Sequence, residues 1–238
     1  MLHRAIGSST LYLLALLAGA VDARQSPGDE CHDAIEQNPS RAAEICVAGA
    51  RAGDVLSQYN LGLFHLDPAG PAPDSIAGER WLRAAAHELP IAAYALGTHL
   101  IEAGRTAEGS ELVRTAADRG VVDAQFDHAT ALLEQPQPSA DTLAQAAHYY
   151  ELAAAAGDIG ARFNLAMLLL GGGAQSAEGP ARGLAWLYTI GALPDHQRVH
   201  DLIKRYEATL SEEQVAAARA LLPELQLGAP RPGGSADG

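Results

Sequence analysis

The one histidine pair with the spacing of metal ligands lies late in the chain. His196 and His200 are four residues apart and would share one face of a helix. A zinc protease places Glu directly after the first histidine, whereas Gln197 stands here and no clear third ligand is nearby. We therefore expect a solvated helix and no metal, and keep a metal-responsive module as an alternative. His65 is expected to be a packed, hydrogen-bonded ring.

Motifs for catalysis are missing from the sequence after its first 23 residues. There is no Gly-x-Ser-x-Gly elbow and no Ser-x-x-Lys stretch to hold a nucleophile against a base. Gly171–Gly173 follows a predicted helix and lacks the Gly-Lys-Ser/Thr of a phosphate loop, so it is expected to be a turn. The acidic residues are scattered along solvent faces. The sequence thus predicts no catalytic residues, no cofactor and no enzyme activity.

Polar side chains at matching places of the predicted helices are the candidates for binding a partner. They are Gln58, Asn60, Gln125, Asp127 and Asn164. The alternative is that the Asn position bonds a neighbouring helix or turn and holds the repeat geometry, a role that constrains Asp127 less.

These candidates lie in a six-residue pattern that occurs four times. The copies are Ser57–Gly62, Ala92–Gly97, Ala124–Ala129 and Ala161–Ala166, and their ends are 35, 32 and 37 residues apart. Each has a small residue two before an aromatic one and Gly or Ala three after it, so that the ring and this later small residue share a helical face. Each copy predicts an amphipathic helix.

A second pattern follows each of these helices, with a bulky residue four before a pair of small ones. Its clearest copies are Trp81 with Ala85–Ala86, Leu112 with Ala116–Ala117, and Tyr149 with Ala153–Ala154. Gly120 and Gly157 end two copies and can adopt a left-handed cap. Residues Ala42–Gly53 fit as a degenerate leading copy. The small pair would let a neighbouring helix approach closely around the bulky side chain.

The two patterns together resemble the Sel1-like repeat family, relatives of tetratricopeptide repeats. Tyr59–Gly62 matches the first half of the family pattern, and Ala147–Gly157 matches most of the second half. The resemblance covers about residues 42–193 and implies an all-α, right-handed α-solenoid of helical hairpins. Departures from the pattern are Leu89 for Gly, Leu112–Val113 for aromatics, His128 for Leu, and Ile190–Gly191 for the Ala pair.

The beginning of the chain reads as a secretory signal. His3 and Arg4 precede an apolar run over Leu11–Leu17, and small residues place the cut after Ala23 or Ala20. The run is too short for the roughly 20 residues of a spanning helix, which argues against a retained membrane anchor. We expect signal cleavage, no membrane insertion of the mature chain, and a periplasmic or secreted location.

Cys31 and Cys46 are expected to form a disulfide. An even count of cysteines in an oxidising compartment favours a bridge, with two buried free thiols as the alternative. Asn38–Pro39 breaks the helical pattern, with Asn38 as a cap and Pro39 at the first helical position. Each cysteine lies about two helical turns from this break, which places the sulfurs opposite each other in an antiparallel hairpin.

The predicted organisation has five parts. Residues 1–23 are the signal peptide, 24–53 the disulfide-stapled hairpin, 54–194 the Sel1-like repeats, 195–227 the C-terminal capping helices and 228–238 a disordered tail. Ser211 and Gln214 form a capping box ahead of a helix over Val215–Leu222, which Pro223 bends or ends.

Composition limits the possible partners. The 238 residues are 48% hydrophobic with a formal charge of −13, which suits a folded protein and repels nucleic acid. The family resemblance implies a non-enzymatic scaffold or adaptor in the cell envelope that holds a protein or peptide partner in a concave groove. The alternative is an envelope enzyme or a peptidoglycan- or β-lactam-binding protein. Family members of that kind carry a bridge in each repeat, whereas this chain has two cysteines.

Overall fold

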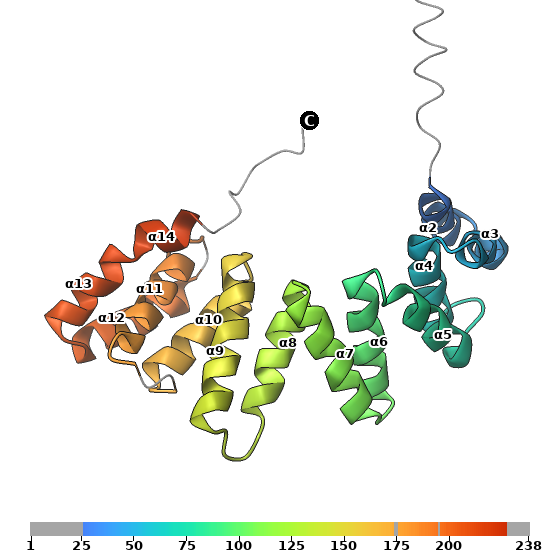
Figure 1. The fold of residues 1–238 in the computed structure, drawn as a ribbon. Coiled ribbons are helices and arrows are strands. Elements are labelled where there is room, and N and C mark those ends of the chain that lie inside the picture. The colour runs from blue at the N-terminus through green and yellow to red at the C-terminus, as the bar shows by residue number, and fades with distance from the viewer. Residues whose placement is uncertain (1–25, 174–175, 195, 228–238) are drawn as a thin grey trace, which may run out of the picture. The chain divides into compact units, whose positions relative to one another are not determined.

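The computed structural model describes residues 26–173, 176–194 and 196–227, and the regular structure in these ranges is entirely helical (Figure 1). The all-α prediction is thus confirmed. The predicted signal peptide and C-terminal tail lie outside the described residues. The chain divides into two compact units, which end and begin at Leu89 and Pro90. No helix in the described part is long and apolar enough to cross a membrane.

The N-terminal unit consists of two helical hairpins. Its helices are α2 (Pro27–Gln37), α3 (Pro39–Arg51), α4 (Val55–Leu66) and α5 (Ser75–Ala85). Helix α4 packs on each of the other three helices. The core joins both cysteines to Leu61 and Phe64, with Trp81 packed against it. The first hairpin of this unit is the predicted stapled one, and the second is the first full repeat.

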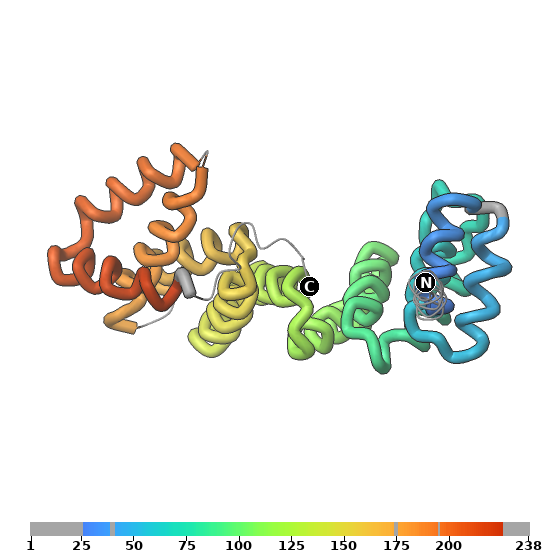
Figure 2. The backbone as a smooth tube through the Cα atoms, turned by 90° about the horizontal axis from the view of Figure 1, so that it is seen from above, coloured from blue at the N-terminus to red at the C-terminus, as the bar shows by residue number. Residues whose placement is uncertain are grey.

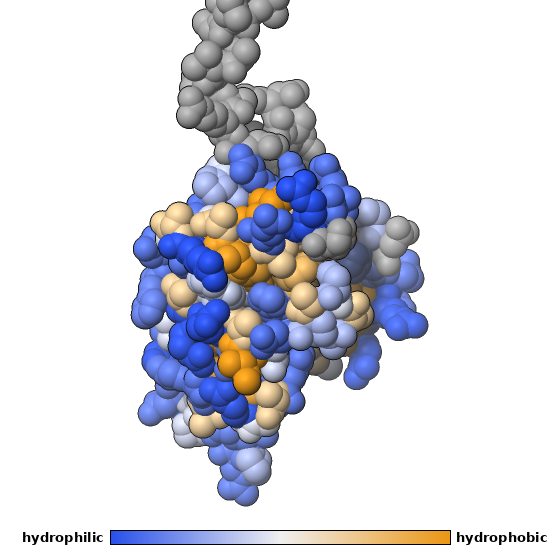
Figure 3. Space-filling view, turned by 90° about the vertical axis from the view of Figure 1, so that its right-hand side faces the viewer, coloured by the Kyte–Doolittle hydropathy of each residue, from blue (hydrophilic) through white to orange (hydrophobic). Residues whose placement is uncertain are grey.

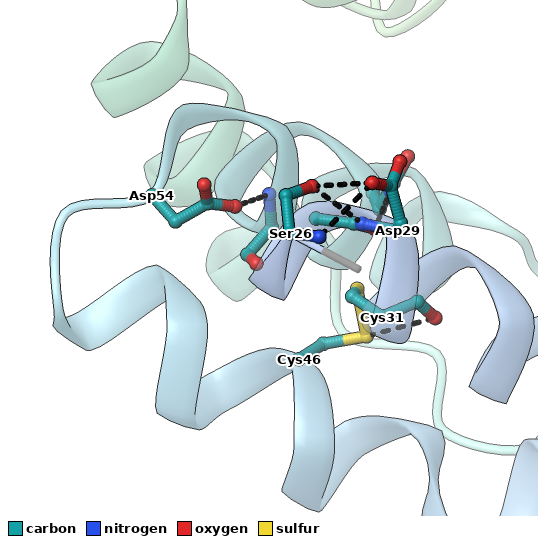
Figure 4. The surroundings of a disulfide bond; sticks show 8 residues. Ser26, Asp29, Cys31, Cys46 and Asp54 are labelled. Atoms are coloured by element: carbon teal, nitrogen blue, oxygen red, sulfur yellow. Dashed lines mark hydrogen bonds between the residues drawn. A yellow bond between two sulfur atoms is a disulfide. The ribbon is translucent and has the colours of Figure 1, made fainter. Parts of the chain in front are cut away.

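The predicted disulfide is present between α2 and α3. The Cα atoms of Cys31 and Cys46 are 4.6 Å apart, and both residues are fully buried (Figure 4). Helix α2 begins with a capping box in which Ser26 Oγ accepts from the Asp29 backbone N–H and the Asp29 carboxylate accepts from the Ser26 N–H. The capping box fixes the residue at which α2 begins. It thereby fixes which face of the helix carries Cys31, one turn later, and this face meets α3.

The C-terminal unit contains three more hairpins and a group of closing helices. The hairpins are α6 (Pro90–Glu102) with α7 (Thr106–Asp118), α8 (Val122–Leu133) with α9 (Ala140–Ala155), and α10 (Ile159–Leu170) with α11 (Gly179–Gly191). Consecutive helices from α6 to α11 pack on one another, and the tube in Figure 2 turns back at each connection. The core of this unit centres on Tyr150, Trp186 and the leucines around them.

Three further helices close this unit. They are α12 (Gln197–Thr209), α13 (Glu212–Ala220) and α14 (Leu222–Leu227), and all three pack on α11. The predicted capping box is present, because Ser211 Oγ accepts from the Gln214 N–H and the Gln214 side chain accepts from the Ser211 N–H. The helix after it begins at Glu212, three residues earlier than predicted, and ends at Ala220, two residues earlier than predicted. It ends before Pro223, which lies in the first turn of α14.

Three connections between hairpins share one turn. Gly53, Gly120 and Gly157 have φ of 90°, 90° and 106°, which only glycine adopts readily. In each turn the glycine N–H donates to the carbonyl three residues back, and the next N–H donates to the carbonyl five residues before it. These are Schellman caps, so the left-handed prediction is confirmed. Leu89 replaces this glycine between α5 and α6, and its N–H instead donates to the Ala85 carbonyl in a helical turn.

In three of the hairpins, small residues lie where the two helices cross. A Cβ on Gly109 would lie 2.5 Å from the Gly97 carbonyl oxygen, and one on Gly183 would lie 2.9 Å from that of Ala166. Gly78 has the same relation to Gly62, at 3.0 Å. Such approach leaves no room for a methyl group, so these residue types fix how closely the helices pack.

We predict that removing the disulfide destabilises the chain without changing its fold. Cys31→Ala/Cys46→Ala is expected to lower the free energy of unfolding by about 3 kcal/mol, because the 15-residue loop is no longer closed in the unfolded chain. Urea unfolding followed by circular dichroism measures this. Dithiothreitol should destabilise the wild type and leave the double variant unchanged; equal stability of oxidised and reduced wild type would contradict the prediction.

Candidate functional site

Two of the five candidate binding residues hold neighbouring hairpins together. Gln58 Nε2 donates to the Ala50 carbonyl at 3.2 Å, and Gln125 Nε2 donates to that of Ala117 at 3.3 Å. Arg162 occupies the equivalent position in α10, and its Nε donates to the Ala154 carbonyl at 3.2 Å. We call these three contacts the clasps. Arg162 was not among the residues predicted from the sequence, although each donor follows its acceptor by eight residues.

Each clasp ends on a carbonyl that already belongs to a Schellman cap. Ala50, Ala117 and Ala154 also accept from Gly53, Gly120 and Gly157. One carbonyl oxygen, with two lone pairs, therefore joins the end of one hairpin to the first helix of the next. The equivalent position in α6 is Ala93, which has no side-chain donor. Its hairpin follows Leu89, which stands in place of the cap glycine. Both the glycine of the cap and the donor of the clasp are therefore replaced at the boundary between the two units.

Asn60 and Asn164 also bond within the repeats. Asn60 Nδ2 donates to the Gly28 carbonyl at 3.2 Å, which ties α4 to the first turn of α2. Asn164 Nδ2 lies 3.2 Å from the hydroxyl of Tyr150, which lies 2.9 Å from Thr130 Oγ1. This series of bonds runs through α10, α9 and α8. These contacts fit the structural alternative for the Asn position, and contact of these residues with a partner stays a prediction.

Asp127 connects two first helices. Its carboxylate accepts from the Tyr94 hydroxyl at 2.8 Å, which joins α8 to α6. Burial raises the pKa of Tyr94, and the bond to Asp127 and the negative charges of Asp127 and Asp123 raise it further. The Tyr94 hydroxyl therefore stays protonated at neutral pH and donates to the Asp127 carboxylate, which this bond holds in place.

A cleft lies beside this bond on the first helices of the C-terminal unit. Its lining residues are Tyr94, Asp123, Phe126, Asp127, Asp158 and Gly160. A Cβ on Gly160 would lie 3.1 Å from the Phe126 ring, so glycine lets this ring lie against the start of α10. Asp158 caps α10 by accepting from the Ala161 N–H at 2.5 Å. Ile159 and Phe163, both on α10, are 42% and 38% exposed.

The N-terminal unit has its own cleft between α2, α4 and the connection that follows α4. Asn60 lines it together with apolar side chains, among them Ile35, Leu63 and Phe64. His65 Nδ1 lies 3.0 Å from the Ala72 carbonyl, so it is hydrogen-bonded as expected and holds the connection that walls this cleft. Seen from the side of this unit, apolar patches lie among hydrophilic side chains (Figure 3).

The second helices of the C-terminal unit carry a separate polar network. The Tyr149 hydroxyl on α9 donates to Asp118 on α7 at 2.5 Å, and Arg182 on α11 pairs with Glu151 on α9. Burial and the bond to Asp118 raise the pKa of Tyr149 to about 12. His128 packs edge to face on Tyr149, with ring centroids 4.7 Å apart. This network links the second helices of successive hairpins.

The histidine pair meets backbone carbonyls. His196 Nδ1 lies 2.6 Å from the Pro194 carbonyl and His200 Nε2 lies 2.7 Å from that of Gly191. Within the residues that the structure describes, no group of three or more His, Cys, Asp or Glu side chains is arranged to hold a metal ion. Both histidines thus contact backbone carbonyls near the start of α12.

Comparisons with known proteins identify the fold. No protein-family model matches the sequence, and no curated protein does either. A protective antigen of uropathogenic Escherichia coli, described as displaying an SLR fold, superposes with a TM-score of 0.62 over 90% of this chain at 22% identity. A Sel1 repeat protein from Oxalobacter formigenes superposes with a TM-score of 0.56 over 82% of this chain, also at 22% identity. This chain has the Sel1-like repeat fold.

The two similar structures differ in length. The chain spans 44% of the E. coli antigen and 97% of the O. formigenes protein. The aligned part of this chain thus spans nearly all of one of these structures and less than half of the other. The expectation drawn from the repeated residues is confirmed at the level of the fold.

His128 departs from the Sel1-like pattern, and we predict that it makes the free energy of unfolding depend on pH. Leu61, Leu96 and Leu165 fill the equivalent positions and are 0–1% exposed. Burial lowers the pKa of His128, which the charges of Asp118 and Glu111 raise and that of Arg114 lowers. The unfolded chain therefore binds this proton more readily, and stability falls as the pH drops through about 6.5.

The substitution His128→Leu tests this. It is expected to raise the free energy of unfolding by about 1 kcal/mol at pH 8, from added apolar burial, and by more at pH 5.5. Thermal melts of both proteins at the two pH values measure the difference. A stabilisation that is the same at pH 5.5 and pH 8 would show that the ring stays uncharged or solvated.

Proposed function

We propose that this chain is an exported, non-enzymatic scaffold or adaptor of the cell envelope, which holds a protein or peptide segment on the first helices of its repeats. The support is that polar side chains on these helices make internal bonds, whereas some apolar side chains stay exposed. Gln58, Gln125 and Arg162 are used in clasps, while Ile159 and Phe163 remain exposed on α10, the helix whose first turn lines the cleft.

The exposed Phe163 is the observation that carries this proposal. It occupies the aromatic position of the repeat, where Tyr94 and Phe126 are partly buried between first helices. A large ring left 38% exposed on α10, one helical turn after Ile159, offers apolar area for a partner to cover. Partners commonly bind such surfaces by inserting a few anchor side chains.

Export rests on different features. The sequence predicts a signal peptide over residues 1–23, and the disulfide between Cys31 and Cys46 suits an oxidising compartment. The E. coli protein of similar fold is described as a protective antigen, which agrees with an envelope or secreted location for this chain.

The five candidate residues differ in how far they are open to a partner. Gln125 is 6% exposed and serves the clasp, so its contribution to a partner is through the shape of the surface. Gln58, Asn60, Asp127 and Asn164 are half-buried and border the first-helix surfaces while making their internal bonds.

Affinity capture from an envelope fraction tests the scaffold, with Phe163→Ala compared with Leu152→Ala. Leu152 is 39% exposed but lies on a second helix, α9, so it is a matched control. We expect one specific protein to be captured by the wild type and the control and lost with Phe163→Ala. Equal capture by all three would place binding elsewhere.

The rival function is tested on the same preparations. Turnover of nitrocefin, or saturable binding of muropeptides, by the wild type would favour an envelope enzyme or cell-wall binder over the scaffold. We expect neither, since the sequence has no motif that would hold a catalytic nucleophile and the amides of Gln58 and Gln125 are engaged in clasps.

A further inference from the structure

The cleft between α6, α8 and α10 has the chemistry of a receptor for a positively charged side chain. Two aromatic rings, Tyr94 and Phe126, line it together with the carboxylates of Asp123, Asp127 and Asp158. None of its lining residues is Lys, Arg or His. An ammonium or guanidinium group is attracted both to carboxylates and to the faces of aromatic rings.

The three carboxylates are not equivalent. Asp158 caps α10, and its charge acts on the neighbouring Arg162. Asp127 accepts one bond from Tyr94, and an ionised carboxylate has about four acceptor sites. Asp123 is exposed in the first turn of α8. Asp123 and Asp127 are therefore the groups with capacity to bind a further donor.

The electrostatic environment of the cleft agrees with this. The charges of Asp127 and Asp123 both raise the pKa of Tyr94, in addition to burial and the hydrogen bond. Both negative charges therefore act on the ring that walls the cleft. A positive side chain placed there would lower the energy of the two carboxylates together.

An extended organic cation fits the site better than a metal ion. In the described part of the chain no three acidic, His or Cys side chains converge closely enough to ligate a metal. A guanidinium group is planar and presents donors on several edges, so it can bond two separate carboxylates while its face stacks on a ring. The apolar Ile159 and Phe163, on the helix whose first turn lines the cleft, would cover an apolar neighbour in the same segment.

We infer that the partner docks here through an Arg or Lys side chain inserted between Tyr94 and Phe126 toward Asp123 and Asp127, with an adjacent apolar residue on Phe163. This inference rests on the proposed scaffold function and specifies the chemistry of its partner. The occupant is a basic, partly apolar peptide segment.

Selection of phage-displayed dodecapeptides on the purified protein tests the inference. Peptides that contain Arg or Lys beside an apolar residue should be enriched. Synthetic peptides from the selection should bind at least tenfold more weakly when citrulline replaces the Arg or norleucine the Lys, and more weakly at high salt. Fluorescence anisotropy measures both effects.

Variants of the cleft and of a control surface locate the peptide-binding site. Asp123→Asn/Asp127→Asn should weaken the same peptides at least tenfold, and Asp123→Asn alone should weaken them measurably, because Asp123 is exposed and outside the Tyr94 bond. Glu134→Gln/Asp141→Asn removes the same charge from exposed positions outside the cleft and should leave binding unchanged. Thermal melts check that each variant is folded.

The outcomes separate this inference from the proposed function. If enriched peptides are neutral or acidic, or ignore the Asp123 and Asp127 substitutions, yet are lost with Phe163→Ala, the scaffold stands and the cationic anchor is wrong. If charge loss weakens binding equally in the Glu134/Asp141 control, the attraction is nonspecific and the inference is overturned. Enrichment of no peptide contradicts both.

Discussion

The close approach of two helices within three of the hairpins is the constraint on which the rest of the structure depends. At Gly97 and Gly109 a carbonyl oxygen of one helix occupies the space that a methyl group of the other would need. Gly78 and Gly183 make the same approach in other hairpins. Trp186, three residues after Gly183 on α11, is 2% exposed. Larger residues at the crossing would separate the two helices and expose side chains buried between them.

The same geometry decides which polar groups remain for binding. Because consecutive hairpins meet at Schellman caps, a carbonyl of the cap faces the next first helix and takes a Gln or Arg side chain at the three clasps. The next residue along each of these first helices is the aromatic one of the repeat: Phe126 lines the cleft, and Phe163 is exposed. A side chain engaged in a clasp and the ring that follows it thus divide the structural role and the proposed binding role on one helix. Where Leu89 and Ala93 interrupt the pattern, the chain divides into two units.

Much of the fold could be predicted from the sequence because its signals are local or strictly periodic. The left-handed glycines, the capping box at Ser211 and the bridge of Cys31 with Cys46 depend on residue type and short spacing. The roles of Gln58 and Gln125 could not be read in the same way, since an exposed amide and a clasp have the same residue type at the same position. A fixed distance of eight residues from the second Ala was the available signal, and it would also have found Arg162. The Tyr94–Asp127 bond joins helices 33 residues apart and depends on how hairpins stack.

The stability of Gly109→Ala tests the central constraint most directly. On an open helical surface, replacing Gly by Ala stabilises by about 1 kcal/mol through helix propensity. Here the added Cβ meets the Gly97 carbonyl oxygen, so we predict the opposite sign, a loss of about 1–3 kcal/mol in the free energy of unfolding from overpacking. Urea unfolding of the two proteins side by side decides the matter. A stabilised Gly109→Ala protein would contradict the close crossing of α6 and α7 and the account built on it.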